Sequence, residues 1–416
     1  MPLGRDDSGP DRPPLGPGTY QTTRHITRSP AHTRTITKQP TRDRDENSMK
    51  QQTFIELFAG AGGMSLGFEN AGFKCLAATD YWADSSATYR ANFPDTPFIE
   101  RDIREISTTE LLKAAGETPD WIIGGPPCQG YSTVGKRNRT DPRNQLFLEF
   151  FRIVADLKPG GFVIENVLGL KDMSFEEEVS AKFESIGYAV EFNVFTAADY
   201  GVPQLRRRVV FVGTLDGRSY IKPPPIVSPT EYTSVDAAIG DLPPVGAGET
   251  ITDYQRTHPR TEYQKIMRAG STRLQGHTAS NHPDRLIEAI SHIKDGGNRT
   301  QIPDHLQPKS GFHNSYSRLA SWKPAVAVTQ NMGKPSGSRC IHPKQNRGLT
   351  AREGARLQSF PDRFHFEKGV TSQRLQIANA VPPMLAEAIA RSLLNPSSWS
   401  EKCHDAAENN PSPTFA

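Results

Sequence analysis

The stretch "TFIELFAGAGGMSLGFENAG", residues 53–72, decides the fold. Its first six residues are mostly apolar, which predicts a buried strand over 53–58. Glycines follow, and the spacing then becomes helical over 63–72, with Gly72 closing the helix. A strand that passes through a glycine turn into a helix is the first unit of an α/β fold.

The same alternation continues along the chain. Further strands are predicted at 74–80, 97–100, 120–124, 162–167, 188–195 and 207–213, and helices at 83–93, 144–157 and 175–187. Strands that alternate with helices imply a parallel, doubly wound sheet. The last two strands have no clear long helix between them, which indicates an antiparallel pair at the sheet edge. Helical spacing returns at 350–360 and 373–394, after a loop-rich stretch.

Bulk composition excludes several classes of protein. No apolar run approaches the roughly 20 residues that span a bilayer, and the first residues lack the apolar core of a signal peptide. The four cysteines, Cys75, Cys128, Cys340 and Cys403, have no C-x-x-C spacing, which argues against a disulfide framework or a zinc site. We therefore expect a soluble, intracellular protein without a structural metal.

Charge is distributed unevenly along the chain. The net charge is only +3, but 16 Lys and Arg stand against 10 Asp and Glu between Lys222 and Gly348. A basic segment beside a more acidic one indicates a polyanion-binding module joined to a different kind of domain. A solvated basic surface is the plainer alternative.

The glycine turn favours an adenosine-bearing ligand. Gly60, Gly62 and Gly63 lie where a backbone can pass close to a ligand, but Ser65 stands where the dinucleotide fingerprint G-x-G-x-x-G needs its last glycine. Asp80 ends the second strand, where a carboxylate can accept hydrogen bonds from ribose hydroxyls. This combination suits S-adenosylmethionine. A purely structural turn remains the alternative.

A cysteine follows the predicted strand at 120–124, in "WIIGGPPCQGYS", residues 121–132. Strands of doubly wound sheets present functional groups at their carboxyl ends, so Cys128 is a candidate nucleophile. The cations that follow it can lower the pKa of a thiol or hold phosphates; they are Lys136, Arg137, Arg139 and Arg143. A cysteine that fills a gap in the core is the alternative.

Two further strand ends carry charge. Glu165 ends the apolar run of "FVIENV", within expected reach of Cys128. In "QLRRRVVFVG", alternation along an extended chain predicts that Arg206 and Arg208 point to one side and Arg207 to the other. Two guanidinium groups on one face suit a phosphate or a base carbonyl, whereas a solvated basic edge strand would need no ligand.

Taken in order, these stretches resemble the cytosine-5 DNA methyltransferase family, from Thr53 to about Leu394. "FAGAGG" resembles its cofactor motif, "PPCQGYS" its nucleophile motif, "ENV" its glutamate motif and "QLRRR" its Q-x-R-x-R motif. "LTAREGARLQSFPD" and "QIANAVPP" resemble its two late motifs. One departure is Ala378, where the family usually has glycine, although Asn379 is kept.

The resemblance implies an α/β fold: an S-adenosylmethionine-dependent methyltransferase (Rossmann-like) sheet with a small inserted target-recognition domain. The implied boundaries are a disordered tail at 1–48, a catalytic cofactor-binding domain at 49–225, a target-recognition domain at 226–345, late motifs that complete the catalytic domain at 346–395, and a loose tail at 396–416.

The resemblance also implies a reaction, in which a methyl group passes from S-adenosylmethionine to carbon 5 of a flipped cytosine in duplex DNA. Cys128 would attack carbon 6, Glu165 would act at ring nitrogen 3, Arg208 would contact the cytosine carbonyl and Glu165, and Arg206 would contact a phosphate or the base side. The implied cofactor contacts are Phe58, Gly60, Gly62, Gly63, Asp80, Tyr81, Asp102, Ile103, Pro126, Asn379 and Ala380. The implied DNA contacts are Pro127, Gln129, Ser132, Lys136 and Arg143.

The setting implied by the resemblance is a cytoplasmic, nucleoid-associated and monomeric bacterial enzyme of the restriction-modification type, which can be paired with a restriction endonuclease. Three alternatives stay open at this point: a tRNA cytosine-5 methyltransferase, a catalytically inactive DNA-binding relative, and a nucleotide-dependent oxidoreductase with a redox cysteine.

Overall fold

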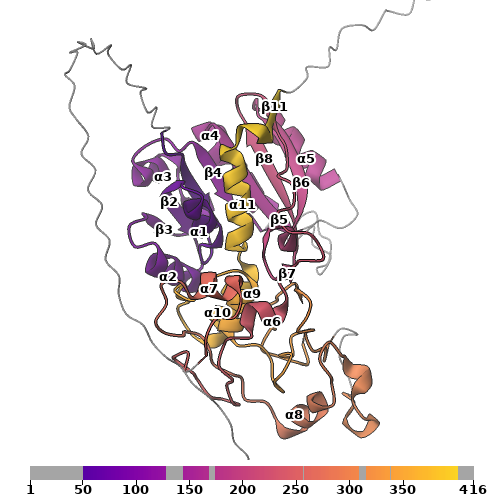
Figure 1. Cartoon of the computed structure of the whole chain (residues 1–416). Coiled ribbons are helices and arrows are strands. Elements are labelled where there is room, and N and C mark those ends of the chain that lie inside the picture. The colour runs from indigo at the N-terminus through magenta and orange to yellow at the C-terminus, as the bar shows by residue number, and fades with distance from the viewer. Residues whose placement is uncertain are drawn as a thin grey trace, which may run out of the picture. The chain divides into compact units, whose positions relative to one another are not determined.

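The central feature of the computed structural model is a seven-stranded sheet of order β3-β2-β1-β4-β5-β8-β6 (Figure 1). The structure describes residues 50–127, 144–167, 174–255, 257–308, 315–337 and 339–401. The sheet strands are β1 (Thr53–Leu57), β2 (Lys74–Asp80), β3 (Phe98–Glu100), β4 (Trp121–Gly124), β5 (Gly161–Val167), β6 (Ala189–Thr196) and β8 (Arg207–Thr214). These strands were all predicted from the sequence, to within about two residues at each end.

One strand of the sheet runs against the others. β8 is antiparallel to both β5 and β6, whereas the pairs from β3 to β5 are parallel. The predicted antiparallel pair is therefore confirmed, with β6 at the edge and β8 inside it. Because antiparallel neighbours need no crossover helix, the short 3₁₀ turn η3 (Ala197–Tyr200) and β7 (Gln204–Leu205) suffice to connect them.

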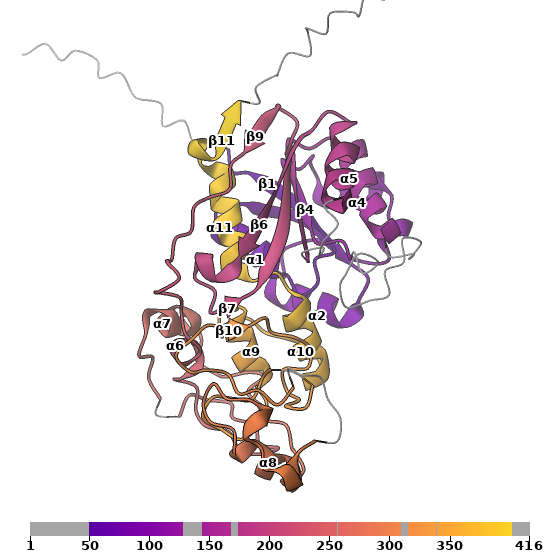
Figure 2. The ribbon, with the colours of Figure 1, turned by 90° about the vertical axis from the view of Figure 1, so that its right-hand side faces the viewer.

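Helices cover both faces of the sheet. Figure 2 shows α4 (Asn144–Leu157) and α5 (Ser174–Glu184) against one face, and α1 (Gly63–Asn70) and α11 (Pro383–Leu394) against the other. Successive sheet residues alternate between the two cores: Phe54 packs with the α1 and α11 side, and Ile55 with the α4 and α5 side. Burial on both faces explains why these strands read as continuous apolar runs.

The remaining helices are short. α2 (Ala83–Asn92) was predicted, whereas α3 (Thr108–Ala115) was not. Between residues 226 and 345 the described chain is mostly loop, with α6 (Val235–Ile239), α7 (Glu262–Arg268), α8 (Asp284–Ser291), the 3₁₀ turns η4 (Arg299–Gln301) and η5 (Asp304–Leu306), and β10 (Ala325–Val326). β10 pairs with β7 in parallel.

The last helical stretch is divided. The sequence predicts helical structure throughout 373–394, but α10 (Val370–Asn379) ends before Pro382 and α11 begins at Pro383. Proline disfavours helical backbone at the residue before it and lacks an amide donor, so the chain turns between the two helices. Upstream, α9 (Ala351–Leu357) begins at a capping box formed by Thr350 and Glu353.

A buried ionic cluster joins α9 to the loop-rich part. The guanidinium of Arg356 contacts Asp241 at 2.5 Å and Asp362 at 2.6 Å, and all three side chains are fully buried. Arg268 of α7 contacts Asp241 at 2.7 Å. Each charge in the cluster therefore has a partner, as buried charges require.

Residues 396–401, predicted to belong to a loose tail, have regular structure, and the rest of that predicted tail lies outside the described residues. The 3₁₀ turn η6 (Pro396–Ser398) and β11 (Trp399–Glu401) continue from α11, and β11 pairs antiparallel with β9 (Arg218–Tyr220). The ring of Trp399 lies 5.5 Å from that of Tyr220, and the Arg218 guanidinium lies 5.0 Å from the Trp399 ring. In the described ranges, no helix is both long and apolar enough to cross a bilayer.

Candidate active site

The carboxyl ends of β4 and β5 meet the amino end of the antiparallel β8, which brings charged side chains together. Nε of Arg208 lies 2.7 Å from Oε1 of Glu165, and the two side chains are 14% and 10% exposed. The contact is an ion pair and not an aligned hydrogen bond, because Oε1 has no hydrogen-bond partner of good geometry among the described residues. Gly125 leaves room here, since a Cβ on it would lie 3.3 Å from Oε2 of Glu165.

The end of β4 is held by the next residue of β5. Nδ2 of Asn166 donates to the carbonyl of Pro126 at 3.0 Å, and both residues are buried. Only glycine fits at position 124, because the neighbouring strand is so close that a Cβ there would lie 2.1 Å from the carbonyl oxygen of Leu57. The backbone of the "GGPP" segment is thus fixed beside Glu165. Pro127 follows, and Cys128 is the next residue of the chain.

Five of the predicted site residues lie outside the described residues. They are Cys128, Gln129, Ser132, Lys136 and Arg143. Pro127, predicted to contact DNA, is described and is partly exposed.

The glycine turn after β1 forms an open cradle. Phe58 and Gly60 have positive φ values of 56° and 55°, and no atom lies within 4 Å of the place where a Cβ on Gly60 would stand. The Gly60 amide donates to Oδ2 of Asp80 at 2.8 Å, so the turn and the end of β2 share one corner. By contrast, a Cβ added to Gly62 would collide with the Phe93 ring, and one added to Gly63 would collide with the Val381 carbonyl.

The corner has the groups that an adenosine-bearing cofactor needs. Oδ1 of Asp80 accepts from the Trp82 amide at 2.8 Å, and burial raises the pKa of this carboxyl. Tyr81, directly beyond Asp80, is 70% exposed although its ring is large and apolar. An open cradle, a carboxylate and an exposed ring in one corner fit S-adenosylmethionine.

Asp102 and Ile103 have clear structural roles. Asp102 accepts from the Arg104 amide at 3.0 Å and from its Nε at 2.9 Å, which caps the 3₁₀ turn η1 (Ile103–Glu105) and lowers the pKa of the Asp102 carboxyl. Ile103 is 5% exposed and packs in the core beneath. Neither arrangement shows the predicted contact with the cofactor, which stays a prediction.

The end of α10 returns to the glycine turn. A Cβ on Gly63 would lie 3.4 Å from the Cβ of Ala380 and 2.3 Å from the Val381 carbonyl oxygen. Asn379 is exposed and Ala378 is 9% exposed within the core. Predicted cofactor residues far apart in the chain, Gly63 and Ala380, are therefore neighbours.

Arg206 has structural partners that the sequence did not indicate. Its side chain is 3% exposed, and its Nη2 donates to the carbonyls of Ala378 at 2.9 Å and Ala380 at 3.3 Å. Burial lowers the pKa of Arg206 to about 9. The guanidinium is enclosed by backbone carbonyls in this arrangement, and its predicted contact with a phosphate or the base side stays a prediction. Arg207 is exposed, so the predicted alternation of sides holds.

Sequence reasoning missed a buried polar cluster beneath the cradle. Glu56 of β1 is 2% exposed, and its Oε2 accepts from the amide and the hydroxyl of Ser65. The Ser65 hydroxyl lies 2.7 Å from that of Tyr89. Burial raises the pKa of Glu56 to about 8. The sequence signal that could have revealed this cluster is the glutamate inside the otherwise apolar run "TFIEL".

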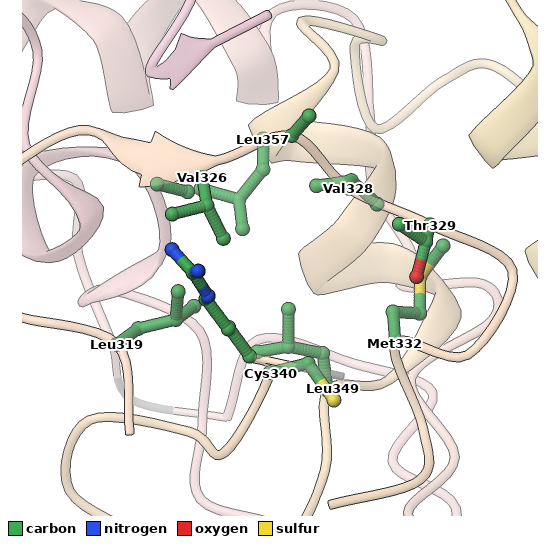
Figure 3. A pocket seen from close by; sticks show the side chains of 11 residues that line it. Leu319, Val326, Val328, Thr329, Met332, Cys340, Leu349 and Leu357 are labelled. Carbon is green, nitrogen blue, oxygen red and sulfur yellow. The ribbon is translucent and has the colours of Figure 1, made fainter. Parts of the chain in front are cut away.

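A pocket of about 280 Å³ lies beside β10 (Figure 3). It is mostly apolar and has one cationic side chain. Its lining residues are Leu319, Ala325, Val326, Ala327, Val328, Thr329, Met332, Arg339, Cys340, Leu349 and Leu357. Within the described part of the chain, no cluster of His, Cys, Asp or Glu side chains could hold a metal ion.

Comparisons with known proteins agree with this geometry. A family model described as C-5 cytosine-specific DNA methylase matches residues 52–395. Type II methyltransferase M1.HphI of Haemophilus parahaemolyticus is 43% identical over 349 residues, covering 82% of this chain and 86% of that protein. Type II methyltransferase M.DdeI of Desulfomicrobium norvegicum is 41% identical over 368 residues, covering 81% and 87%. The crystal structure of a candidate DNA modification methyltransferase encoded within an E. coli prophage matches with a TM-score of 0.68 and 25% identity, over 83% of this chain and 99% of that one.

Proposed function

The chain belongs to the C-5 cytosine-specific DNA methylase family, and from this premise we propose how it acts. It transfers a methyl group from S-adenosylmethionine to carbon 5 of a cytosine that is flipped out of a specific duplex sequence. The observation that carries the proposal is the nearly buried pair of Glu165 and Arg208 beside the "GGPP" segment that leads to Cys128.

Residues of two chain regions hold the cofactor. The cradle at Gly60 and the exposed Tyr81 ring take the adenosine, with Asp80 on the ribose hydroxyls, and Asn379 and Ala380 close the corner from the other side. When bound, S-adenosylmethionine supplies an electrophilic methyl group. Asp80 is preorganised for its role because two backbone amides already fix its carboxylate.

Cytosine carbon 5 is a weak nucleophile, and covalent addition divides one difficult step into easier ones. The Cys128 thiolate forms a bond to carbon 6, and the electrons of the ring double bond move toward carbon 5 as Glu165 delivers a proton to nitrogen 3. Carbon 5 then takes the methyl group as the bond from that methyl to the sulfonium sulfur breaks. A base removes the proton from carbon 5, the bond between carbon 6 and sulfur breaks to restore the thiolate, and nitrogen 3 returns its proton to Glu165.

Arg208 orients this chemistry. Its Nε holds Oε1 of Glu165, and its remaining donors can reach the cytosine carbonyl. The Pro127 carbonyl contacts the flipped base, Gln129 and Ser132 belong to the loop that closes over DNA, and Lys136 and Arg143 contact phosphates.

The names of the relatives support a bacterial enzyme of the Type II modification class. The proposal adds that it acts as a monomer on double-stranded DNA and is paired with a restriction endonuclease. The proposal places it in the cytoplasm, in association with the nucleoid.

The proposal is tested by following labelled methyl transfer from S-adenosylmethionine to duplex DNA and to tRNA, with bisulfite sequencing of the DNA product. We expect methylated cytosine in one duplex sequence. A duplex with 5-fluorocytosine at that position should form a covalent complex that survives denaturation, because fluorine cannot leave as a proton does. Methylation of tRNA and not of DNA would overturn the proposal that duplex DNA is the substrate. Full activity of Cys128→Ser would overturn the proposed mechanism.

A further inference from the structure

The pocket beside β10 has the size and chemistry of a small binding site. Its volume of about 280 Å³ is close to the lower end of the range for ligand pockets. Leu319, Val326 and Leu349 give it apolar walls (Figure 3), while Ala327 and Thr329 are exposed at its edge. An apolar hollow that opens to solvent beside polar groups favours a flat, partly apolar ligand.

Arg339 is the cation of this pocket. It is exposed, and its guanidinium has no hydrogen bond or ion pair to any residue that the structure describes. Nearby arginines differ: Arg347 contacts Glu353 at 2.7 Å, and Arg318 donates to several backbone carbonyls. A guanidinium left without a partner beside an apolar surface keeps its planar fork of donors available to a ligand.

The pocket is fixed to the segment that directly precedes β8, the strand that carries Arg208. The Val328 amide donates to Oε1 of Gln204 at 2.7 Å, and Nη1 of Arg206 lies 3.5 Å from the Val328 carbonyl oxygen. Gln204 is fully buried and also donates to the Leu357 carbonyl at 2.9 Å. A ligand in the pocket would therefore lie at a set position relative to the Glu165–Arg208 pair.

We infer that this pocket reads a base pair of the recognised duplex beside the target cytosine. The Arg339 fork donates to O6 and N7 of a guanine, and the apolar walls contact the edge of an adjacent base, such as a thymine methyl group. The inference rests on the proposed function and deepens it, by naming a specificity-determining residue and the base it selects.

The test compares wild type with Arg339→Ala and Arg339→Lys on a library of duplexes with randomised flanks, sequenced after bisulfite conversion. Wild type defines the recognised sequence. We expect Arg339→Ala to lose discrimination at one guanine position by roughly 5- to 150-fold while other positions keep theirs. Arg339→Lys keeps the charge but not the planar fork, so discrimination should stay weakened.

Lys113→Ala, which removes an exposed cation from α3, is the matched control and should leave the sequence preference unchanged. A uniform loss of affinity that Arg339→Lys restores, with unchanged base preference, would show a phosphate contact and overturn the inference. An unchanged affinity and base preference in both Arg339 variants would overturn the inference as well. If wild type methylates no DNA at all, the proposed function fails; if wild type is active and only the preference at guanine is unaffected, the inference alone fails.

Discussion

Nε of Arg208 and Oε1 of Glu165 lie 2.7 Å apart, across the pairing of β5 with the antiparallel β8. In the register of β5 and β8, Val167 is opposite Arg208 and Glu165 is opposite Val210. The arginine therefore reaches back along the strand to the carboxylate. This geometry keeps one carboxylate at the strand end in a fixed orientation for a substrate group.

Glu165→Gln tests that carboxylate. We expect the rate of methyl transfer in a single turnover to fall by roughly 10²- to 10⁴-fold, because Gln cannot deliver a proton. Binding of S-adenosylmethionine, followed by calorimetry, should be unchanged. Glu178→Gln on the exposed surface of α5 is the control and should keep full activity. A Glu165→Gln enzyme with a wild-type rate would remove this residue from the mechanism.

Arg206→Met tests whether this arginine acts through its buried backbone contacts or through DNA. The carbonyls of Ala378 and Ala380 lose a buried donor, so we expect the free energy of unfolding in urea to fall by about 1–3 kcal/mol. Arg207→Ala, at the exposed neighbour, should change it by less than about 0.5 kcal/mol. An Arg206→Met protein of unchanged stability that no longer binds DNA would instead restore the phosphate contact expected from sequence.

Glu56 makes stability depend on pH. Burial raises its pKa from 4.5 to about 8, so between these values the folded state binds a proton that the unfolded state has released. Its contribution to stability is fully present below about pH 4.5 and is lost as pH rises through about 8. We expect the free energy of unfolding to decrease over this window by up to about 1.4 kcal/mol per pH unit.

The measurement is urea unfolding at intervals from pH 5 to 9 for wild type and Glu56→Gln. The variant carries no titrating carboxyl and can still accept from Ser65, so its curve should be flatter than that of wild type. Parallel curves would show that Glu56 does not titrate in this window.

Gly63→Ala tests the contact between the glycine turn and the last motif. The added Cβ would lie 2.3 Å from the Val381 carbonyl oxygen, which is backbone and cannot move aside cheaply. We expect a loss of about 1–3 kcal/mol in unfolding free energy and weaker binding of S-adenosylmethionine. Gly369→Ala, where a Cβ meets no atom within 4 Å, should lose no more than about 1 kcal/mol through its helix-cap position. Equal effects of the two variants would contradict the close approach.

The strands and the larger helices could be predicted because their patterns are local. Strands buried on both faces read as apolar runs, and α4 has clear helical spacing. The short helices α3, α6, α7 and α8 could not be predicted in the same way, since they have one or two turns and depend on tertiary packing. Pro382 and Pro383 signalled the break before α11, but the helical spacing of the apolar residues around them led to the prediction of continuous helical structure.

The same difference between local patterns and long-range packing decides which parts of the candidate site could be predicted. The proximity of Glu165 and Arg208 was implied by the family resemblance, and Asp80 beside the glycine turn follows from the order of β1 and β2. The partners of Arg206 lie in α10, more than 170 residues downstream, where local alternation carries no information. The roles of Cys128 and its loop remain predictions from the motif.

The packing of α11 on α1 also affects how the protein is made. A Cβ on Gly67 would lie 2.5 Å from that of Ala386, and Asn70 and Glu387, which hydrogen-bond at 3.4 Å, are separated by 317 residues. At roughly 5–20 residues per second, a ribosome needs on the order of 15–60 s to pass from one helix to the other. During that time the glycine turn lacks its neighbours from the end of α10 and from α11, so the proposed cofactor corner is incomplete. A premature stop anywhere before α10 would then release a product that lacks one side of that corner.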